Sequence, residues 1–199
     1  PRVLLIGDSI SIGYTIPVQK LLQGVANVHR APENCGPANR GLKKLDKWLG
    51  GGRWDVIHFN FGLHDLKYVD EKGNYVPPDR GKQVAPLADY ERQLQEITTR
   101  LKATGARVIF ATTTPIPEGA KGRVKGDEIK YNRAAIAIMQ SENVPVDDLH
   151  AWISQEIQKG QPGAVQQKAN VHFTDSGSDK LAEQVARSIR EQLPAKANP

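Results

Sequence analysis

A glycine, an acid and two hydroxyl residues follow the first apolar run of the chain. The run from Val3 to Ile6 leads directly into GDSISIG at residues 7–13. A serine between a strand and a helix presents its hydroxyl near the positive end of the helix dipole. Asp and Ser are also common turn and cap residues. The local pattern therefore predicts either a plain turn or a nucleophilic Ser9, and it matches neither GxxxxGK[ST] nor GxGxxG.

A nucleophilic serine requires partners elsewhere in the chain, because a free hydroxyl needs a base and the reaction needs donors for the oxyanion. His172 lies in NVHFTDSG, immediately before the last helical pattern. Gly36 lies in NCGPANRG, and GLHD at residues 62–65 follows another apolar run. All these segments come after predicted strands. Their position at one edge of a sheet favours the nucleophile interpretation of Ser9 over the plain turn.

Strand-like and helical patterns alternate along the chain and predict how these residues are positioned. We expect strands over 2–8, 26–30, 54–62, 106–114 and 144–150, and helices over 13–25, 40–51, 86–105, 127–143, 151–158 and 176–193. This series is typical of the α/β class, as a three-layer α/β/α domain whose parallel sheet has about five strands. We expect a single domain over 1–199, with long loops at 66–85 and 115–126 above the carboxyl edge of the sheet.

Four ordered segments resemble the conserved blocks of the SGNH hydrolases, also called the GDSL-type esterase/lipase family. They are IGDSIS, NCGPANRG, NFGLHD and NVHFTDSG. The resemblance implies a flavodoxin-like fold, Ser9 as nucleophile and His172 as base. It also implies an oxyanion hole that contains the N–H groups of Ser9 and Gly36, with Gly41 as second choice for the latter. No metal or organic cofactor is implied.

The third block departs from the family, because His64 stands where the family has an oxyanion-hole asparagine. An imidazole can donate a hydrogen bond, so we expect His64 to replace the asparagine. The alternative is that Asn60 supplies the donor. Asp65 and Asp8 are expected to support the site by bracing loop backbone, Asp65 in this block and Asp8 at the turn that carries the nucleophile.

The fourth block departs more sharply. Ala169 occupies the position of the family aspartate that orients and stabilises the catalytic imidazole. Either this position has been altered, or the natural enzyme orients His172 in another way. A backbone carbonyl, Asn170, Asp175 or Asp148 are the candidates for that role, and the third catalytic member stays open.

The resemblance predicts a serine esterase that acts on small acyl esters, with acetyl as the default and carbohydrate deacetylation as the leading specific function. A long hydrophobic lid is missing from the sequence, which disfavours a true lipase. Lys67 and Tyr68 are candidate substrate contacts because they follow the third block. The alternatives are a thioesterase or lysophospholipase of the same fold, which predicts an apolar channel beside Ser9, and a catalytically impaired carbohydrate-binding domain.

Composition limits the partners of the chain. The 199 residues carry a formal net charge of +5, but the 27 basic residues are interspersed with 22 acids, which disfavours nucleic-acid binding. No apolar run reaches the roughly 18 residues of a membrane span, so no membrane insertion is expected. The single cysteine excludes an internal disulfide. A secreted or periplasmic location is favoured if a leader was removed, and the oligomeric state is not predicted.

Overall fold

A parallel sheet of five strands forms the centre of the molecule. The computed structural model describes residues 1–193, and the strand order in this sheet is β2-β1-β3-β6-β7. These strands are β1 (Arg2–Ile6), β2 (Asn27–Arg30), β3 (Val56–Phe59), β6 (Arg107–Ala111) and β7 (Val146–Asp147). Val3 pairs with Val28 on one side and Val56 on the other, all in parallel register. The expected α/β architecture with about five parallel strands is confirmed.

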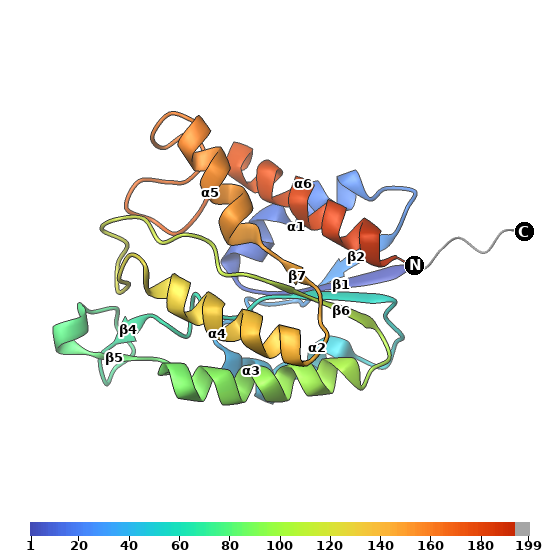
Figure 1. Cartoon of the computed structure of the whole chain (residues 1–199), viewed down its shortest axis with the longest axis horizontal. Coiled ribbons are helices and arrows are strands. Elements are labelled where there is room, and N and C mark those ends of the chain that lie inside the picture. Colours follow the sequence, from blue (N-terminus) through green and yellow to red (C-terminus); the bar gives the residue numbers. More distant parts are fainter. Residues whose placement is uncertain (194–199) are drawn as a thin grey trace, which may run out of the picture.

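Helices cover both faces of the sheet and complete three layers (Figure 1). The helices are α1 (Ser9–Leu21), α2 (Ala38–Leu49), α3 (Leu87–Lys102), α4 (Asp127–Ser141), α5 (Leu149–Lys159) and α6 (Asp175–Gln192). Helix α6 packs against α1 and α5 on one face, while α3 packs between α2 and α4 on the other. In the described part of the chain, no helix combines the length and the apolar character that crossing a bilayer requires.

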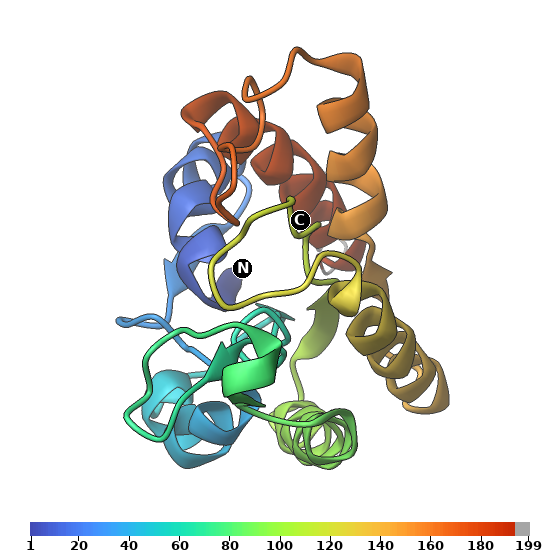
Figure 2. The same cartoon turned by 90° about the vertical axis from the view of Figure 1, so that its left-hand side faces the viewer.

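The strand order reverses between β1 and β3, since β1 connects outward to β2 while later strands add on the opposite side. The loops that follow β1 and β3 therefore run to opposite sides of the sheet and leave a crevice at the carboxyl ends of these two strands. Ligands of open α/β sheets usually bind in such a crevice. Figure 2 looks onto this edge, where residues 66–85, residues 115–126 and the segment before α6 surround the centre.

Burial of both faces explains the continuous apolar runs of the central strands. Residues Val3 to Ile6 of β1 are fully buried. His58 of β3 is an equally buried polar exception, and its Nε2 lies 2.9 Å from Oδ2 of Asp147. Gln184 donates to the other oxygen of Asp147 at 2.9 Å. His58 thus belongs to a polar contact inside the core.

Two predicted segments differ from the structure. Helix α1 begins at Ser9 and not at residue 13, because Asp8 caps it, and it continues through Pro17. The segment 66–85 is not a plain loop. It holds a short antiparallel pair, β4 (Tyr68–Val69) and β5 (Lys82–Gln83), and the 3₁₀ helix η1 (Pro78–Arg80). Strands of two residues are too short to produce a recognisable alternation of apolar and polar residues.

Candidate active site

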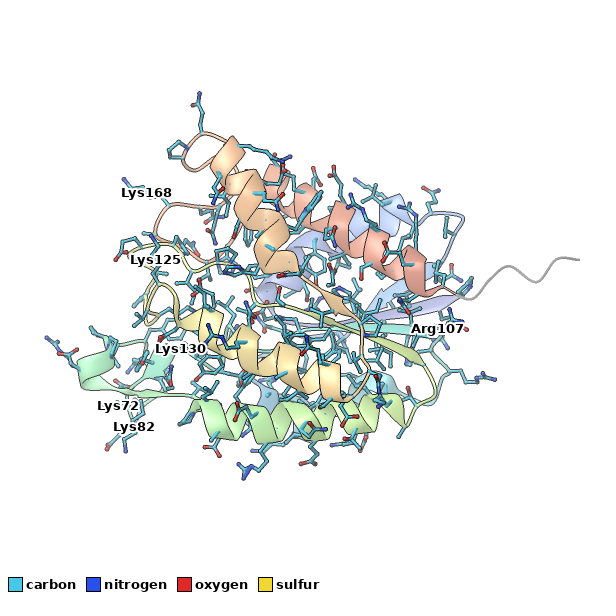
Figure 3. All side chains as sticks on the ribbon, viewed as in Figure 1. Lys72, Lys82, Arg107, Lys125, Lys130 and Lys168 are labelled. Carbon is cyan, nitrogen blue, oxygen red and sulfur yellow. The ribbon has the colours of Figure 1, made fainter. Side chains whose placement is uncertain are left out.

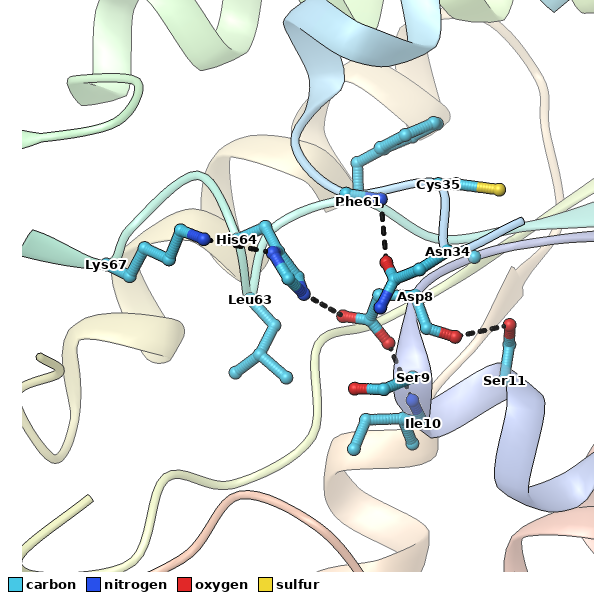
Figure 4. Close-up of polar contacts among 12 residues, drawn as sticks. Asp8, Ser9, Ile10, Ser11, Asn34, Cys35, Phe61, Leu63, His64 and Lys67 are labelled. Atoms are coloured by element: carbon cyan, nitrogen blue, oxygen red, sulfur yellow. Dashed lines mark hydrogen bonds and ion pairs between the residues drawn. The ribbon is translucent and has the colours of Figure 1, made fainter. Parts of the chain in front are cut away.

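The turn between β1 and α1 holds Ser9 at the first position of the helix (Figure 4). Gly7 is required there, because a Cβ at this position would lie 2.9 Å from Cβ of Ser11. The Asp8 carboxylate caps the helix by accepting the Ile10 N–H at 2.9 Å, and its carbonyl accepts the Ser11 hydroxyl at 2.8 Å. As the first helical residue, Ser9 has a backbone N–H without a partner inside the helix, free to meet a ligand.

His172 reaches the nucleophile position from the loop before α6. Its Nε2 lies 2.8 Å from Oγ of Ser9. On the other side of the ring, Nδ1 lies 2.8 Å from Oδ1 of Asn170, which also accepts the His172 backbone N–H at 3.1 Å. The Nδ2 group of Asn170 donates to Oε1 of Gln167 at 2.9 Å.

These contacts determine the tautomer of His172. A backbone N–H only donates, so the Asn170 atom facing it must be the carbonyl oxygen. That oxygen then requires a hydrogen on Nδ1 of His172. The neutral ring consequently has a bare Nε2, which accepts the Ser9 hydroxyl. The Ser9 hydroxyl is thus hydrogen-bonded to a nitrogen that can accept its proton.

Ala169, which stands at the expected third position, brings no polar group to this contact. Its backbone adopts a left-handed conformation with φ of 51°, and Asn170 follows this turn. The other acidic candidates lie elsewhere. Oδ1 of Asp148 accepts the hydroxyl of Thr112 at 2.9 Å, and Asp175 is exposed in the first turn of α6. Of the open alternatives, the structure places Asn170 on the imidazole.

His64 lies between a lysine and an aspartate (Figure 4). Nζ of Lys67 is 3.2 Å from its Nδ1, and Oδ2 of Asp8 is 4.0 Å from its Nε2. Burial, with the Lys67 charge as the second cause, lowers the pKa of His64 to about 3. The ring is therefore neutral near pH 7. Because an ammonium group only donates, Nδ1 accepts and Nε2 carries the hydrogen, 4.0 Å from Oδ2 of Asp8.

Gly36 lies in the loop after β2 and has a positive φ of 64°. Its N–H donates to Oδ1 of Asn34 at 3.0 Å. The loop is joined to the nucleophile turn, because the Cys35 N–H donates to the Gly7 carbonyl at 3.1 Å. Arg30 donates to the same carbonyl at 3.2 Å. These bonds hold the Gly36 segment against the turn that carries Ser9.

The two second-choice donors have other partners. The Gly41 N–H bonds to the Pro37 carbonyl at 3.1 Å at the start of α2. The side-chain amide of Asn60 donates to the Ala111 carbonyl at 2.7 Å and so links the ends of β3 and β6. Neither residue lines the pocket that contains Ser9.

Asp65 braces the loop of the third block from inside the protein. Its Oδ1 accepts the N–H of Ala38 at 2.8 Å, at the first residue of α2, and its own N–H donates to the Gly62 carbonyl at 2.9 Å. Within the described residues, Oδ2 has no hydrogen-bond partner. Burial raises the pKa of Asp65 to about 7. Gly62 has a φ of 149°, and a Cβ there would lie 2.1 Å from Oγ1 of Thr113.

A pocket of about 420 Å³ opens beside Ser9, and its lining combines polar and basic residues with Ala120, Ala169 and Val171. Asn34, Tyr75, Lys121 and Arg123 line it, and the sequence did not identify them individually. Tyr75, Lys121 and Arg123 belong to the segments 66–85 and 115–126, which were predicted to lie over this edge of the sheet. The sequence thus indicated these segments but not the individual residues. Neither of the two predicted substrate contacts, Lys67 and Tyr68, lines the pocket, although Nζ of Lys67 lies 3.2 Å from Nδ1 of the pocket residue His64. Within residues 1–193, no three His, Cys, Asp or Glu side chains are grouped to hold a metal ion.

A model of the GDSL-like lipase/acylhydrolase family matches residues 5–180. The chain belongs to this family. As a GDSL-like acylhydrolase it is a hydrolase that acts on ester substrates. The match extends from β1 into α6 and includes the nucleophile turn, the loop of His64 and the loop of His172. None of the curated proteins compared with this GDSL-like acylhydrolase matches it.

Solved structures share the fold of this acylhydrolase over nearly its whole length. The acetylxylan esterase Axe2 from Geobacillus stearothermophilus is 20% identical, with a TM-score of 0.77 over 98% of this chain and 97% of that chain. A lipase/acylhydrolase from Enterococcus faecalis is 21% identical, with a TM-score of 0.76 over 99% of each chain. The acetyl xylan esterase AlAXEase is 16% identical, with a TM-score of 0.76 over 95% of this chain and all of that chain.

Proposed function

We propose that this acylhydrolase is a serine esterase that removes small acyl groups, acetyl in particular, from carbohydrate hydroxyls. The observation that carries the proposal is the hydrogen-bonded series from Ser9 Oγ to His172 Nε2 and from His172 Nδ1 to Asn170 Oδ1, both at 2.8 Å. Ser9 is the nucleophile, His172 is the general base and acid, and Asn170 positions the imidazole.

In the acylation step, Nε2 of His172 takes the Ser9 proton as Oγ bonds to the ester carbonyl carbon. The carbonyl π electrons move to oxygen and form a tetrahedral oxyanion. When this intermediate collapses, the bond to the alcohol oxygen breaks, and the proton on Nε2 passes to that oxygen. The alcohol leaves, and the acyl group remains on Ser9.

Deacylation repeats these steps with water. His172 takes a proton from water as its oxygen attacks the acyl carbonyl carbon. The collapse of the second intermediate breaks the bond to Oγ and returns the proton to Ser9. In both steps, the oxyanion accepts from the N–H groups of Ser9 and Gly36 and from Nε2 of His64. One such donor typically contributes about 2.7–4 kcal/mol to transition-state stabilisation.

The character of the pocket supports a small acyl group. Its lining places the polar groups of Asn34, His64, Lys121 and Arg123 beside the small apolar residues Ala120, Ala169 and Val171, a mixed surface that suits a small acyl group better than a fatty acyl chain. This disfavours the thioesterase or lysophospholipase alternative. Two of the structures with the same fold are described as acetylxylan esterases, which supports an acetyl ester of a carbohydrate as the substrate proposed here.

The test is hydrolysis of p-nitrophenyl acetate, butyrate and octanoate by the parent protein and by Ser9→Ala. Ser141→Ala is the matched control, because Ser141 is exposed at the end of α4. We expect turnover that falls with acyl length, disappears in Ser9→Ala and persists in the control. Turnover that rises toward octanoate would favour the long-chain alternative. A lack of Ser9-dependent turnover on all three esters would instead favour a catalytically impaired carbohydrate-binding domain.

A further inference from the structure

The pocket beside Ser9 has basic groups in its wall and no acidic ones. Lys121 and Arg123 line it, and both come from the segment 115–126. Lys67 lies at its edge, where Nζ contacts the pocket residues His64 and Tyr75 at 3.2 and 3.3 Å. The charge of this wall is therefore positive.

These cations have no carboxylate partners. Within the described residues, Lys67, Lys121 and Arg123 form no ion pair with an Asp or Glu within 4 Å. The carboxylate of Asp8 is buried at the nucleophile turn and does not line the pocket. Some basic residues elsewhere on the surface are paired, as Arg92 is with Asp89 and Lys159 is with Glu156, whereas others, such as Lys125, form no ion pair with any residue among 1–193 either.

Arg123 is held in position by neutral acceptors. Its Nε donates to the Leu63 carbonyl at 3.1 Å, and Nη1 lies 3.4 Å from the Lys121 carbonyl. Its guanidinium carbon lies 5.6 Å from the centre of the Tyr75 ring, and the Lys67 ammonium lies 4.8 Å from it. These contacts fix the direction of the guanidinium. The buried Asp8 carboxylate acts on its charge from a distance but forms no ion pair with it. A positioned, half-buried guanidinium without an ion-pair partner favours binding of an anion.

We propose that this pocket binds a carboxylate carried by the ester substrate, so that the acylhydrolase prefers anionic esters. The inference rests on the proposed function, because the anion lies next to the serine that would attack the ester. Arg123 and Lys121 supply charge-assisted hydrogen bonds to the carboxylate, and Lys67 adds to the positive field. The carboxylate belongs either to the alcohol, as in an acetylated uronic acid, or to the acyl group, as in a succinyl half ester.

The experiment compares matched pairs of esters that differ in this charge. For the alcohol side, the pair is an acetyl ester of methyl glucuronoside and the same ester of methyl glucoside. For the acyl side, it is p-nitrophenyl hemisuccinate and p-nitrophenyl butyrate. The measured quantity is the ratio of kcat/KM for the anionic ester to that for the neutral ester, at low and at high salt.

In the parent protein we expect a ratio above about 10 in one of the two pairs, because a hydrogen bond to a charged group contributes roughly this factor or more. Salt should lower the ratio by screening. Arg123→Gln and Lys121→Gln should each lower the ratio severalfold. The control is Lys125→Gln, since Lys125 is exposed in the same segment but does not line the pocket (Figure 3). Its ratio should equal that of the parent.

The two variants differ in their risk to folding. Arg123 donates to the Leu63 carbonyl, so Arg123→Gln can disturb folding, whereas Lys121 is exposed. If Arg123→Gln does not fold, Lys121→Gln still tests the effect of the positive charge. A parent ratio near 1 in both pairs, or a ratio unchanged in Lys121→Gln, overturns the inference. If p-nitrophenyl acetate is still hydrolysed in a Ser9-dependent manner in that case, the proposed function stands. Absence of that turnover would overturn both.

Discussion

Oδ1 of Asn170 accepts two hydrogen bonds from His172, one from its backbone N–H at 3.1 Å and one from Nδ1 at 2.8 Å. The neutral amide therefore stands in the place where the family resemblance implies an aspartate at position 169. It orients the ring and selects its tautomer as an aspartate would. It brings no negative charge to stabilise the imidazolium that forms in the proposed mechanism.

Variants of Asn170 should change kcat in opposite directions. Asn170→Ala removes the hydrogen bond that holds the imidazole and should lower kcat about tenfold or more. Asn170→Asp should raise kcat about tenfold, because a bond to a charged acceptor is stronger than one to a neutral acceptor. Ala169→Asp should add little while Asn170 occupies Nδ1. Steady-state kinetics on p-nitrophenyl acetate measure this, and an unchanged kcat in Asn170→Ala would contradict it.

His64 should be replaceable by the family residue but not by alanine. His64→Ala removes one oxyanion donor and should lower kcat by about 10²–10³. His64→Asn keeps an N–H donor and should retain most of the rate. Because the pKa of His64 is about 3, its titration should produce no change in rate between pH 5 and 9. The variants are compared by kcat and KM, and the prediction fails if His64→Ala is as fast as the parent.

Asp65 should make the folded protein less stable as the pH rises. Its pKa is about 7 in the folded state and 3.8 without the fold, so between these values only the folded state holds the proton. The free energy of unfolding should therefore fall across this window, by up to about 4 kcal/mol. Asp65→Asn lacks the titration. Urea denaturation at pH 4 and pH 8 measures the free energy of unfolding of both proteins. The value for the variant relative to that of the parent should be higher at pH 8 than at pH 4.

Ala169 is strained, and its replacement by glycine should stabilise the protein. An L-residue at a φ of 51° costs about 1–2 kcal/mol, of which the greater entropy of unfolded glycine cancels part. We expect Ala169→Gly to raise the free energy of unfolding by about 0.5–1 kcal/mol. The same substitution at the exposed helical residue Ala137 should lower it by a similar amount. Equal signs for the two changes would refute this explanation.

Much of the fold could be predicted because its central strands are buried on both faces. The run from Val3 to Ile6 shows this burial directly in its composition. The pair β4 and β5 could not be predicted, since two residues per strand carry no periodic signal. The predicted start of α1 at residue 13 was wrong for a different reason. Pro17 suggested a late start, whereas capping by Asp8 sets the start at Ser9.

The candidate site shows a similar division. Ser9 and His172 were predicted to lie together because both stand in ordered motifs, and the structure places Oγ and Nε2 2.8 Å apart. Asn170 was one of several open candidates for the third position, because its contact with the imidazole follows a left-handed backbone at Ala169 that motif spacing does not reveal. Arg123 was not identified because its position depends on the Leu63 carbonyl, which is distant in sequence.

The hydrogen bond from Gly36 N–H to the Asn34 amide oxygen at 3.0 Å means that an acceptor of the protein's own already occupies this donor in the resting molecule. In the proposed mechanism, a substrate must displace that oxygen. The neutral carbonyl of a bound ester is an acceptor of similar strength and gains little from the exchange. The tetrahedral oxyanion is a much stronger acceptor and gains the full difference. Losing the bond to Asn34 costs the same in both states, so the net gain from the Gly36 N–H is close to zero for the bound ester and is made only in the transition state, where it accelerates the reaction.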